Sequence, residues 1–81
     1  MDLSTKDEKE LKMSEEDIKI KLGIKIRSLR QNKNLSQEQL SALTKLHRNY
    51  ISDVERGQRN ISIVAIYRIA EGLDIEIKDL F

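Results

Sequence analysis

The sequence has no cysteine, no proline and no tryptophan, and its 81 residues include one histidine and three glycines. Without cysteine the chain cannot form disulfides, thiolate nucleophiles or cysteine-ligated zinc sites. The absence of proline favours a compact helical bundle over a sandwich with many turns. No apolar run approaches the ~20 residues that cross a bilayer, so we expect no membrane partner. The first residues also lack the basic and apolar segments of a secretory signal.

The residues that usually carry catalysis are also scarce. His47 is the single histidine, and no cysteine or paired carboxylate lies beside it to complete a triad or a metal site. The sequence has no glycine-rich phosphate loop. We therefore expect no enzyme, no catalytic residue, no metal and no cofactor, and we expect His47 to cap the helix that follows it.

Charge is distributed unevenly along the chain, although the net charge is only +1. Residues 1–17 have a net charge of −4, residues 18–60 of +7, and residues 61–81 of −2. A basic middle segment can bind a polyanion even when the whole chain is nearly neutral. The alternative is that these cations only solvate helix surfaces.

Serines mark the starts of three predicted helices. Ser14 and Ser36 begin capping boxes, and Ser62 precedes a third apolar repeat. Together with glycine and asparagine stops, they predict helices over about 15–31, 37–44, 48–56 and 63–71, and a short final helical turn within 74–81. The sequence thus predicts an all-α, compact five-helix domain over residues 18–81, preceded by a charged N-terminal extension, residues 1–17.

Apolar spacing predicts which helix faces are buried. The predicted buried side chains are Ile18, Leu22, Ile26 and Leu29 in the first helix, Leu40 and Leu43 in the second, and Ile63, Ile66, Tyr67 and Ala70 in the fourth. Gly23 costs helix stability and therefore predicts a close approach by another helix.

The predicted helix 48–56 has two different faces. At 100° per residue, Ile51, Val54 and Glu55 lie on one side and Asn49, Ser52 and Asp53 on the other. Arg48 and Tyr50 lie at the edges between them. Many surface helices are amphipathic in this way, so the polar face by itself could be merely solvated.

The polar face nevertheless carries side chains that suit DNA. Arg48 matches the acceptors of guanine, and Asn49 matches an adenine edge. Tyr50 and Ser52 can contact a phosphate or a thymine methyl group. Asp53 could accept from cytosine N4, or it could orient Arg48 or Arg56.

Polar residues on either side of this helix could hold the DNA backbone. Gln37 lies at a helix N-terminus, where backbone N–H groups attract phosphate. Arg56 ends helix 48–56, and Arg59 and Asn60 follow it, where a second phosphate strand could pass. The alternative for Arg59 and Asn60 is ordinary loop polarity.

Residues 22–81 resemble the Cro and phage-repressor (Xre) type of helix-turn-helix domain, a lambda-repressor-like fold. The motifs that carry this resemblance are Gly23, Ile26, Leu29, Arg30, the run 36–40, Ile51, Ser52, the run 54–57 and the pattern over 66–81. The runs 48–52 and 55–62 are similar to restriction–modification controller proteins. One departure is Lys45, which stands where the family usually has a glycine in the turn.

The resemblance implies a sequence-specific transcriptional regulator that binds a pseudo-palindromic double-stranded DNA operator as a homodimer. It implies DNA contacts by the polar residues named above and a buried ion pair between Arg30 and Glu55. It also implies a bacterial or phage protein of the cytoplasm and nucleoid, with RNA polymerase as a further candidate partner. The rival class is an antitoxin-like or adaptor domain that binds another protein.

A symmetric dimer needs an apolar surface, and the end of the chain offers more apolar residues than a small core needs. These residues are Ile69, Ile75, Ile77, Leu80 and Phe81. We expect some of them to form the interface, although they could instead only complete the bundle.

Overall fold

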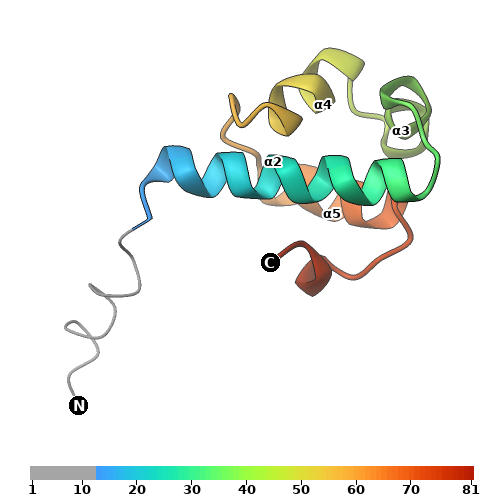
Figure 1. The fold of residues 1–81 in the computed structure, drawn as a ribbon. Helices are drawn as coiled ribbons and strands as arrows, with labels where there is room; N and C mark the ends of the chain where they lie inside the picture. Colours follow the sequence, from blue (N-terminus) through green and yellow to red (C-terminus); the bar gives the residue numbers. More distant parts are fainter. Residues whose placement is uncertain (1–12) are drawn as a thin grey trace.

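The computed structural model describes residues 13–81 as an all-helical fold (Figure 1). Its elements are α2 (Glu15–Asn32), α3 (Gln37–Thr44), α4 (Arg48–Glu55), α5 (Ile63–Gly72) and the 3₁₀ helix η1 (Ile77–Leu80). Most of the predicted charged extension lies outside the described residues, so the boundary at residue 17 stays a prediction.

The prediction of five helices needs a correction. Residues 13–81 contain four α-helices, and the expected fifth is only the four-residue 3₁₀ helix η1. Asp74 takes a left-handed conformation with φ of 57° just after α5, and Glu76 caps η1 in an extended one. These two breaks leave too few residues for an α-helix, and 3₁₀ geometry is common in such short pieces.

The three serine caps are confirmed. The hydroxyl oxygen of Ser14 accepts a hydrogen bond from the backbone N–H of Asp17 at 3.1 Å. Ser36 and Gln39 form a reciprocal capping box, with bonds of 3.0 and 2.8 Å. Ser62 accepts from the Ala65 N–H at 3.1 Å. Each bond satisfies a backbone donor that the first turn of a helix leaves free.

The core lies where the four α-helices meet. α2 packs against α4, and α3 packs against both α4 and α5. In Figure 1, α3 and α4 lie on one side of α2, and the end of the chain lies on the other. Each of the four α-helices contributes one fully buried side chain, and the residue after α5 adds another: Ile26, Leu40, Ile51, Ile69 and Leu73.

Four of the predicted core residues are wrong, since the structure exposes Ile18, Leu43, Ile63 and Tyr67 by 45–70%. The helical periodicity of these segments is as predicted, but the buried faces of α3 and α5 are narrower than predicted. Leu40 and Thr44 fill the inner face of α3. Ala65, Ile66, Ile69 and Ala70 fill that of α5. Ile18 lies in the first turns of α2, at the rim of the bundle.

Gly23 confirms the predicted close approach between helices. A Cβ atom at this position would collide with the carbonyl oxygen of Val54 and lie 2.7 Å from that of Glu55. The backbone of α2 therefore touches the end of α4 directly. Only glycine permits this approach, so it sets the distance between the two helices.

The turn between α3 and α4 has the left-handed residue that the family pattern implies, although it is a lysine. Lys45 has φ of 60° and ψ of 20°. Thr44 donates to the carbonyl of Leu40 at 2.8 Å and accepts from the N–H of Leu46 at 3.2 Å. Ser41 donates to the Leu46 carbonyl at 2.5 Å. These bonds hold the turn despite the strain at Lys45.

A buried ion pair ties α2 to α4. Arg30 donates to both carboxylate oxygens of Glu55, at 2.7 and 2.9 Å. Its remaining terminal nitrogen donates to the carbonyl of Leu35 at 2.8 Å. Gln37, the first residue of α3, donates to Glu55 at 3.1 Å. The hydrogen bond to Glu55 raises the pKa of Arg30 above its ordinary value, although burial opposes that shift.

The left-handed conformation of Lys45 makes a stability prediction. Lys45→Gly should raise the free energy of unfolding by about 1 kcal/mol, because glycine has no Cβ to strain at this φ. Urea denaturation followed by circular dichroism measures the change. Asn34→Gly is the matched control, since Asn34 has nearly the same φ of 58° and asparagine tolerates it better. An equal gain at both positions would contradict strain that is specific to lysine.

The buried pair makes a second stability prediction. Glu55→Leu should lower the free energy of unfolding by about 3–5 kcal/mol, because it leaves the Arg30 guanidinium buried without its partner. The double variant Arg30→Met/Glu55→Leu should lose less, because no charge is then stranded. Chemical denaturation of the double variant and of the two single variants, Glu55→Leu and Arg30→Met, tests this, and additive losses would contradict it.

Candidate nucleic-acid interface

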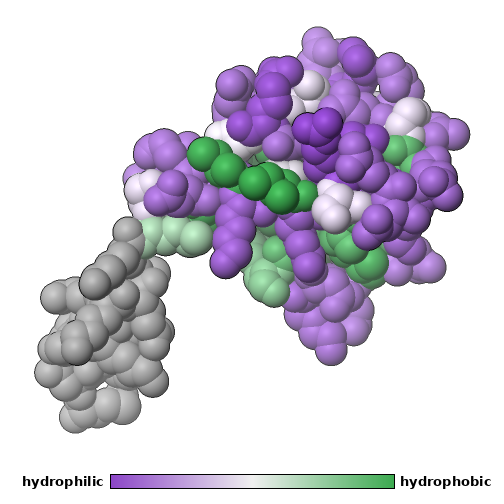
Figure 2. All heavy atoms as spheres, in the orientation of Figure 1, coloured by the Kyte–Doolittle hydropathy of each residue, from purple (hydrophilic) through white to green (hydrophobic). Residues whose placement is uncertain are grey.

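The two faces of α4 are arranged as predicted. Ile51, Val54 and Glu55 are buried against the core, while Arg48 and Asn49 are exposed and Ser52 and Asp53 are half-buried. His47 caps the helix as expected, because its Nδ1 accepts from the Asn49 N–H at 3.1 Å. α4 therefore presents a polar surface at the rim of the molecule, and hydrophilic side chains cover α3 and α4 in Figure 2.

Arg48 is held by an acid from the preceding helix. Its Nε lies 2.8 Å from a carboxylate oxygen of Glu38 in α3, and both side chains are more than half exposed. The pair crosses the turn between the two helices and directs the guanidinium along the outer surface. Such an exposed pair is weak, so Arg48 can exchange Glu38 for another acceptor.

Tyr50 joins α4 to the loop that follows it. Its hydroxyl accepts from the Ser62 N–H at 3.4 Å, and the Arg59 guanidinium lies 4.6 Å from the centre of its ring. Tyr50 also packs against the core. It therefore supports the loop that carries Arg59, while its hydroxyl remains near the surface.

Asp53 brings two arginines together. One carboxylate oxygen accepts from Arg56 at 2.5 Å and the other from Arg59 at 3.2 Å. Arg56 also donates to the hydroxyl of Ser52 at 3.0 Å. The predicted role of Asp53 in orienting Arg56 agrees with this geometry, and the pairing with Arg59 is an additional contact that the sequence does not predict. Arg48, the other predicted partner, pairs with Glu38 instead.

The other predicted contact residues lie around this surface. Asn60 is exposed in the loop after α4. Gln37 is half-buried at the start of α3, and its amide is fixed by the bond to Glu55. The structure therefore brings the polar residues of α4, the start of α3 and the loop 56–62 to the same side of α2 (Figure 1). We name the set Gln37, Arg48, Asn49, Ser52, Asp53, Arg56, Arg59 and Asn60 the α4 surface.

The residues predicted for a dimer interface are separated by the fold. Ile69 and Leu80 are 0% and 3% exposed, so their prediction as interface residues is wrong: they complete the core. Ile75 and Ile77 are half-buried and line a hollow beside Tyr67 and Ala70. Phe81 is 76% exposed and lies against α2 instead.

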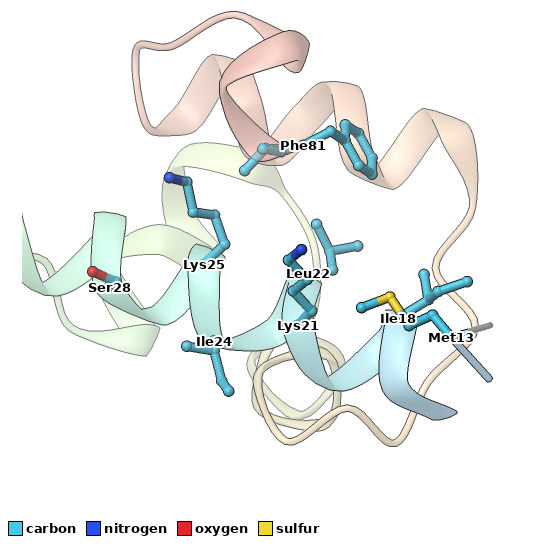
Figure 3. Close-up of a pocket in the computed structure, with 9 residues that line it drawn as sticks. Met13, Ile18, Lys21, Leu22, Ile24, Lys25, Ser28 and Phe81 are labelled. Carbon is cyan, nitrogen blue, oxygen red and sulfur yellow. The ribbon is translucent and has the colours of Figure 1, made fainter. Parts of the chain in front are cut away.

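A second hollow, of about 620 Å³, lies away from the α4 surface. In Figure 3, Met13, Ile18 and Leu22 lie beneath the ring of Phe81, and Lys21 and Lys25 extend beside them. Its lining is mainly apolar and holds no member of the α4 surface. The hollow therefore contributes nothing to the polar site.

Two further observations concern metal binding and membrane-spanning helices in residues 13–81. They contain no cluster of three or more histidine, aspartate or glutamate residues that could hold a metal ion. None of the helices in this part of the chain is long and apolar enough to span a membrane.

Glu38 is the functional candidate that sequence reasoning missed. It looks like an ordinary exposed acid within the Ser36 capping box. Its proximity to Arg48 depends on the angle between α3 and α4, which no local pattern contains. The pairing of Asp53 with Arg56 had a local signal, because Arg56 follows three positions later, at the end of α4; the pairing with Arg59 in the loop had none.

The capped helix α3, the turn with its left-handed residue Lys45, and the second helix α4 with its polar outer face define a helix-turn-helix protein. Residues 26–80 match the family model described as helix-turn-helix. Control protein C.BamHI of Bacillus amyloliquefaciens is 46% identical over 65 residues, covering 79% of this chain and 80% of that protein.

Solved structures agree with this similarity. The restriction–modification controller protein C.AhdI from Aeromonas hydrophila is 51% identical with a TM-score of 0.77, covering 78% of this chain and 96% of that one. The controller C.Esp1396I, solved as a tetramer with its natural 35 base-pair operator, is 31% identical with a TM-score of 0.69. That match covers 76% of this chain and 92% of the other. The chain belongs to the helix-turn-helix family and, within it, to the restriction–modification controller proteins.

Proposed function

We propose that this protein is a transcriptional regulator of the restriction–modification controller type, which binds a pseudo-palindromic operator as a homodimer. The observation that carries the proposal is the α4 surface, a polar helix face held rigidly by a buried ion pair. A short helix of this kind fits the major groove of DNA, where base edges differ in their donors and acceptors. The operator complex of C.Esp1396I supports this function.

The roles follow from the chemistry of each side chain. Arg48 and Asn49 read bases, since they are exposed on α4 and match guanine and adenine edges. Ser52 lies beside them and reaches the groove wall. Gln37 contacts the backbone at the start of α3, where the N–H groups of the first turn face outward. Arg56, Arg59 and Asn60 contact phosphate on the other side, and Tyr50 supports Arg59.

We place the dimer interface on the outer side of α5. Tyr67 is 53% exposed there, and Ile75 and Ile77 flank the hollow beside it. Ile63 and Val64, at the start of α5, add two more exposed apolar side chains. A two-fold axis through such a surface presents two copies of α4 to two half-sites of one duplex.

An adaptor or antitoxin-like domain is the competing function, and salt dependence separates the two. DNA affinity falls steeply as salt rises, because phosphate contacts release counterions. In the proposed role the protein acts in a bacterial or phage-infected cytoplasm, on the nucleoid, and RNA polymerase is a candidate partner. Catalysis has no part in this proposal.

The base-reading role of Arg48 makes a DNA-binding prediction. Arg48→Ala should lower the preference for the operator over single-base variants by about 1–3 kcal/mol, because it removes a bidentate contact to guanine. The operator is first obtained by selecting bound fragments from random duplex DNA. Fluorescence anisotropy titrations then measure the preference.

The matched control is Lys25→Ala, which removes an equal charge from an exposed position of α2, beside the hollow that lies away from the α4 surface. It should leave the preference unchanged, and circular dichroism should show both variants folded. Parent-like discrimination by Arg48→Ala and by Asn49→Ala would show that α4 does not read the bases.

The proposed interface makes an assembly prediction. Tyr67→Asp should raise the dimer Kd by about tenfold or more, because it places an unpaired charge in an apolar contact. Phe81→Asp is the control, since Phe81 lies on the other side of the bundle against α2. Sedimentation equilibrium measures both. A monomer produced by Phe81→Asp and not by Tyr67→Asp would move the interface to the α2 side.

A further inference from the structure

The carboxylate of Asp53 is an unusual feature of a surface that faces a polyanion. It lies on the outer face of α4, with its side chain 30% exposed. DNA carries about one negative charge per 1.7 Å of duplex, so an anion at this position is repelled unless it finds a donor. In the free protein it has two donors, since Arg56 and Arg59 approach its two oxygens.

These ion pairs occupy the groups that would otherwise hold phosphate. Arg56 gives one terminal nitrogen to Asp53 and the other to Ser52. Arg59 is held between the Asp53 carboxylate and the Tyr50 ring. Asp53 thus neutralises one of the two charges and holds both side chains at the protein surface.

The pairs are exchangeable because they are exposed. The side chains of Arg56 and Arg59 are 57% and 44% exposed, in contrast to the 11% and 3% of the buried pair Arg30–Glu55. Exposed ion pairs contribute little to folding and are screened by salt. A phosphate can therefore take either arginine from Asp53 without disturbing the core.

Releasing the arginines has a consequence for Asp53 itself. Its carboxylate accepts hydrogen bonds and cannot donate them. In the major groove the amino group of cytosine satisfies it without a neighbouring acceptor on the same base, whereas adenine sets its amino group beside the N7 acceptor and guanine and thymine present only acceptors. The Asp53 carboxylate therefore links phosphate binding by the two arginines to the identity of the base that it contacts.

We propose that Asp53 is a specificity-determining residue that acts by exchanging partners. In the free protein it holds Arg56 and Arg59. On the operator the arginines pass to phosphates and the carboxylate passes to a cytosine amino group. Where guanine or thymine stands at that position the released carboxylate finds no donor, so Asp53 weakens binding to arbitrary DNA more than binding to the operator. This inference rests on the proposed function.

Asp53→Asn tests the exchange, since it keeps the size of the side chain and removes the charge. Affinity for an arbitrary duplex at about 0.1 M salt should rise about tenfold, and log K should fall more steeply with log salt by about 0.9, as expected for one more free cation. Affinity for the selected operator should change less than threefold. The ratio of the two affinities should therefore fall several-fold, and sequence selection with the variant should lose one preferred cytosine.

Asp74→Asn is the matched control. It changes the net charge equally, at an exposed position after α5 whose φ of 57° suits asparagine. It should leave the affinity ratio and the salt slope as in the parent. Thermal denaturation should show both variants folded, since the Asp53 pairs lie outside the core.

Three outcomes would overturn the exchange. An unchanged or lower affinity of Asp53→Asn for arbitrary DNA would mean that the carboxylate prepares the arginines for binding. Equal gains on the operator and on arbitrary DNA would mean a plain charge effect. An unchanged cytosine preference would remove the base contact. If the parent itself selects no sequence, the proposed function fails as well, which separates the two failures.

Discussion

The buried contact between Arg30 and Glu55 is the interaction on which the presentation of α4 depends. α4 has eight residues, too few to be stable alone in water. Its last residue, Glu55, accepts from α2 through Arg30 and from α3 through Gln37, at distances of 2.7–3.1 Å. Because Arg30 also holds the Leu35 carbonyl, one cluster fixes both helices of the motif and the loop that enters it.

The same kind of ion pair has opposite consequences inside and outside the fold. Little water reaches Arg30 and Glu55 to replace a lost partner, so their hydrogen bonds fix how α4 lies against α2. Glu38 and Asp53 pair with arginines that remain in contact with water, so those bonds direct side chains without fixing them. A rigid frame with exchangeable surface partners is what a reading helix requires, because the frame sets the register while the side chains adapt to the duplex.

Features that depend on neighbours in sequence could be predicted, and those that depend on the packing of distant elements could not. The caps at Ser14, Ser36 and Ser62 and the buried side of α4 follow from local spacing. The exposure of Leu43 and Tyr67 does not, because periodicity gives a direction on a helix but not whether another element covers it. The assignment of Ile69 and Leu80 to a dimer failed for a related reason: cores and interfaces use the same apolar residues.

Most of the pairing of charges around α4 also could not be predicted from neighbours in sequence, and it affects how strongly the α4 surface attracts DNA. The sequence segment 18–60 carries a net charge of +7, but half of its ten basic residues lie along α2. Around α4, three arginines meet two acids, Glu38 and Asp53, and each arginine is paired. A surface so nearly balanced attracts an arbitrary duplex weakly, since non-specific affinity depends on the number of phosphates neutralised. Under the proposed exchange, selective binding comes from the change of partners at matching bases, and acids on a DNA-facing helix then favour discrimination.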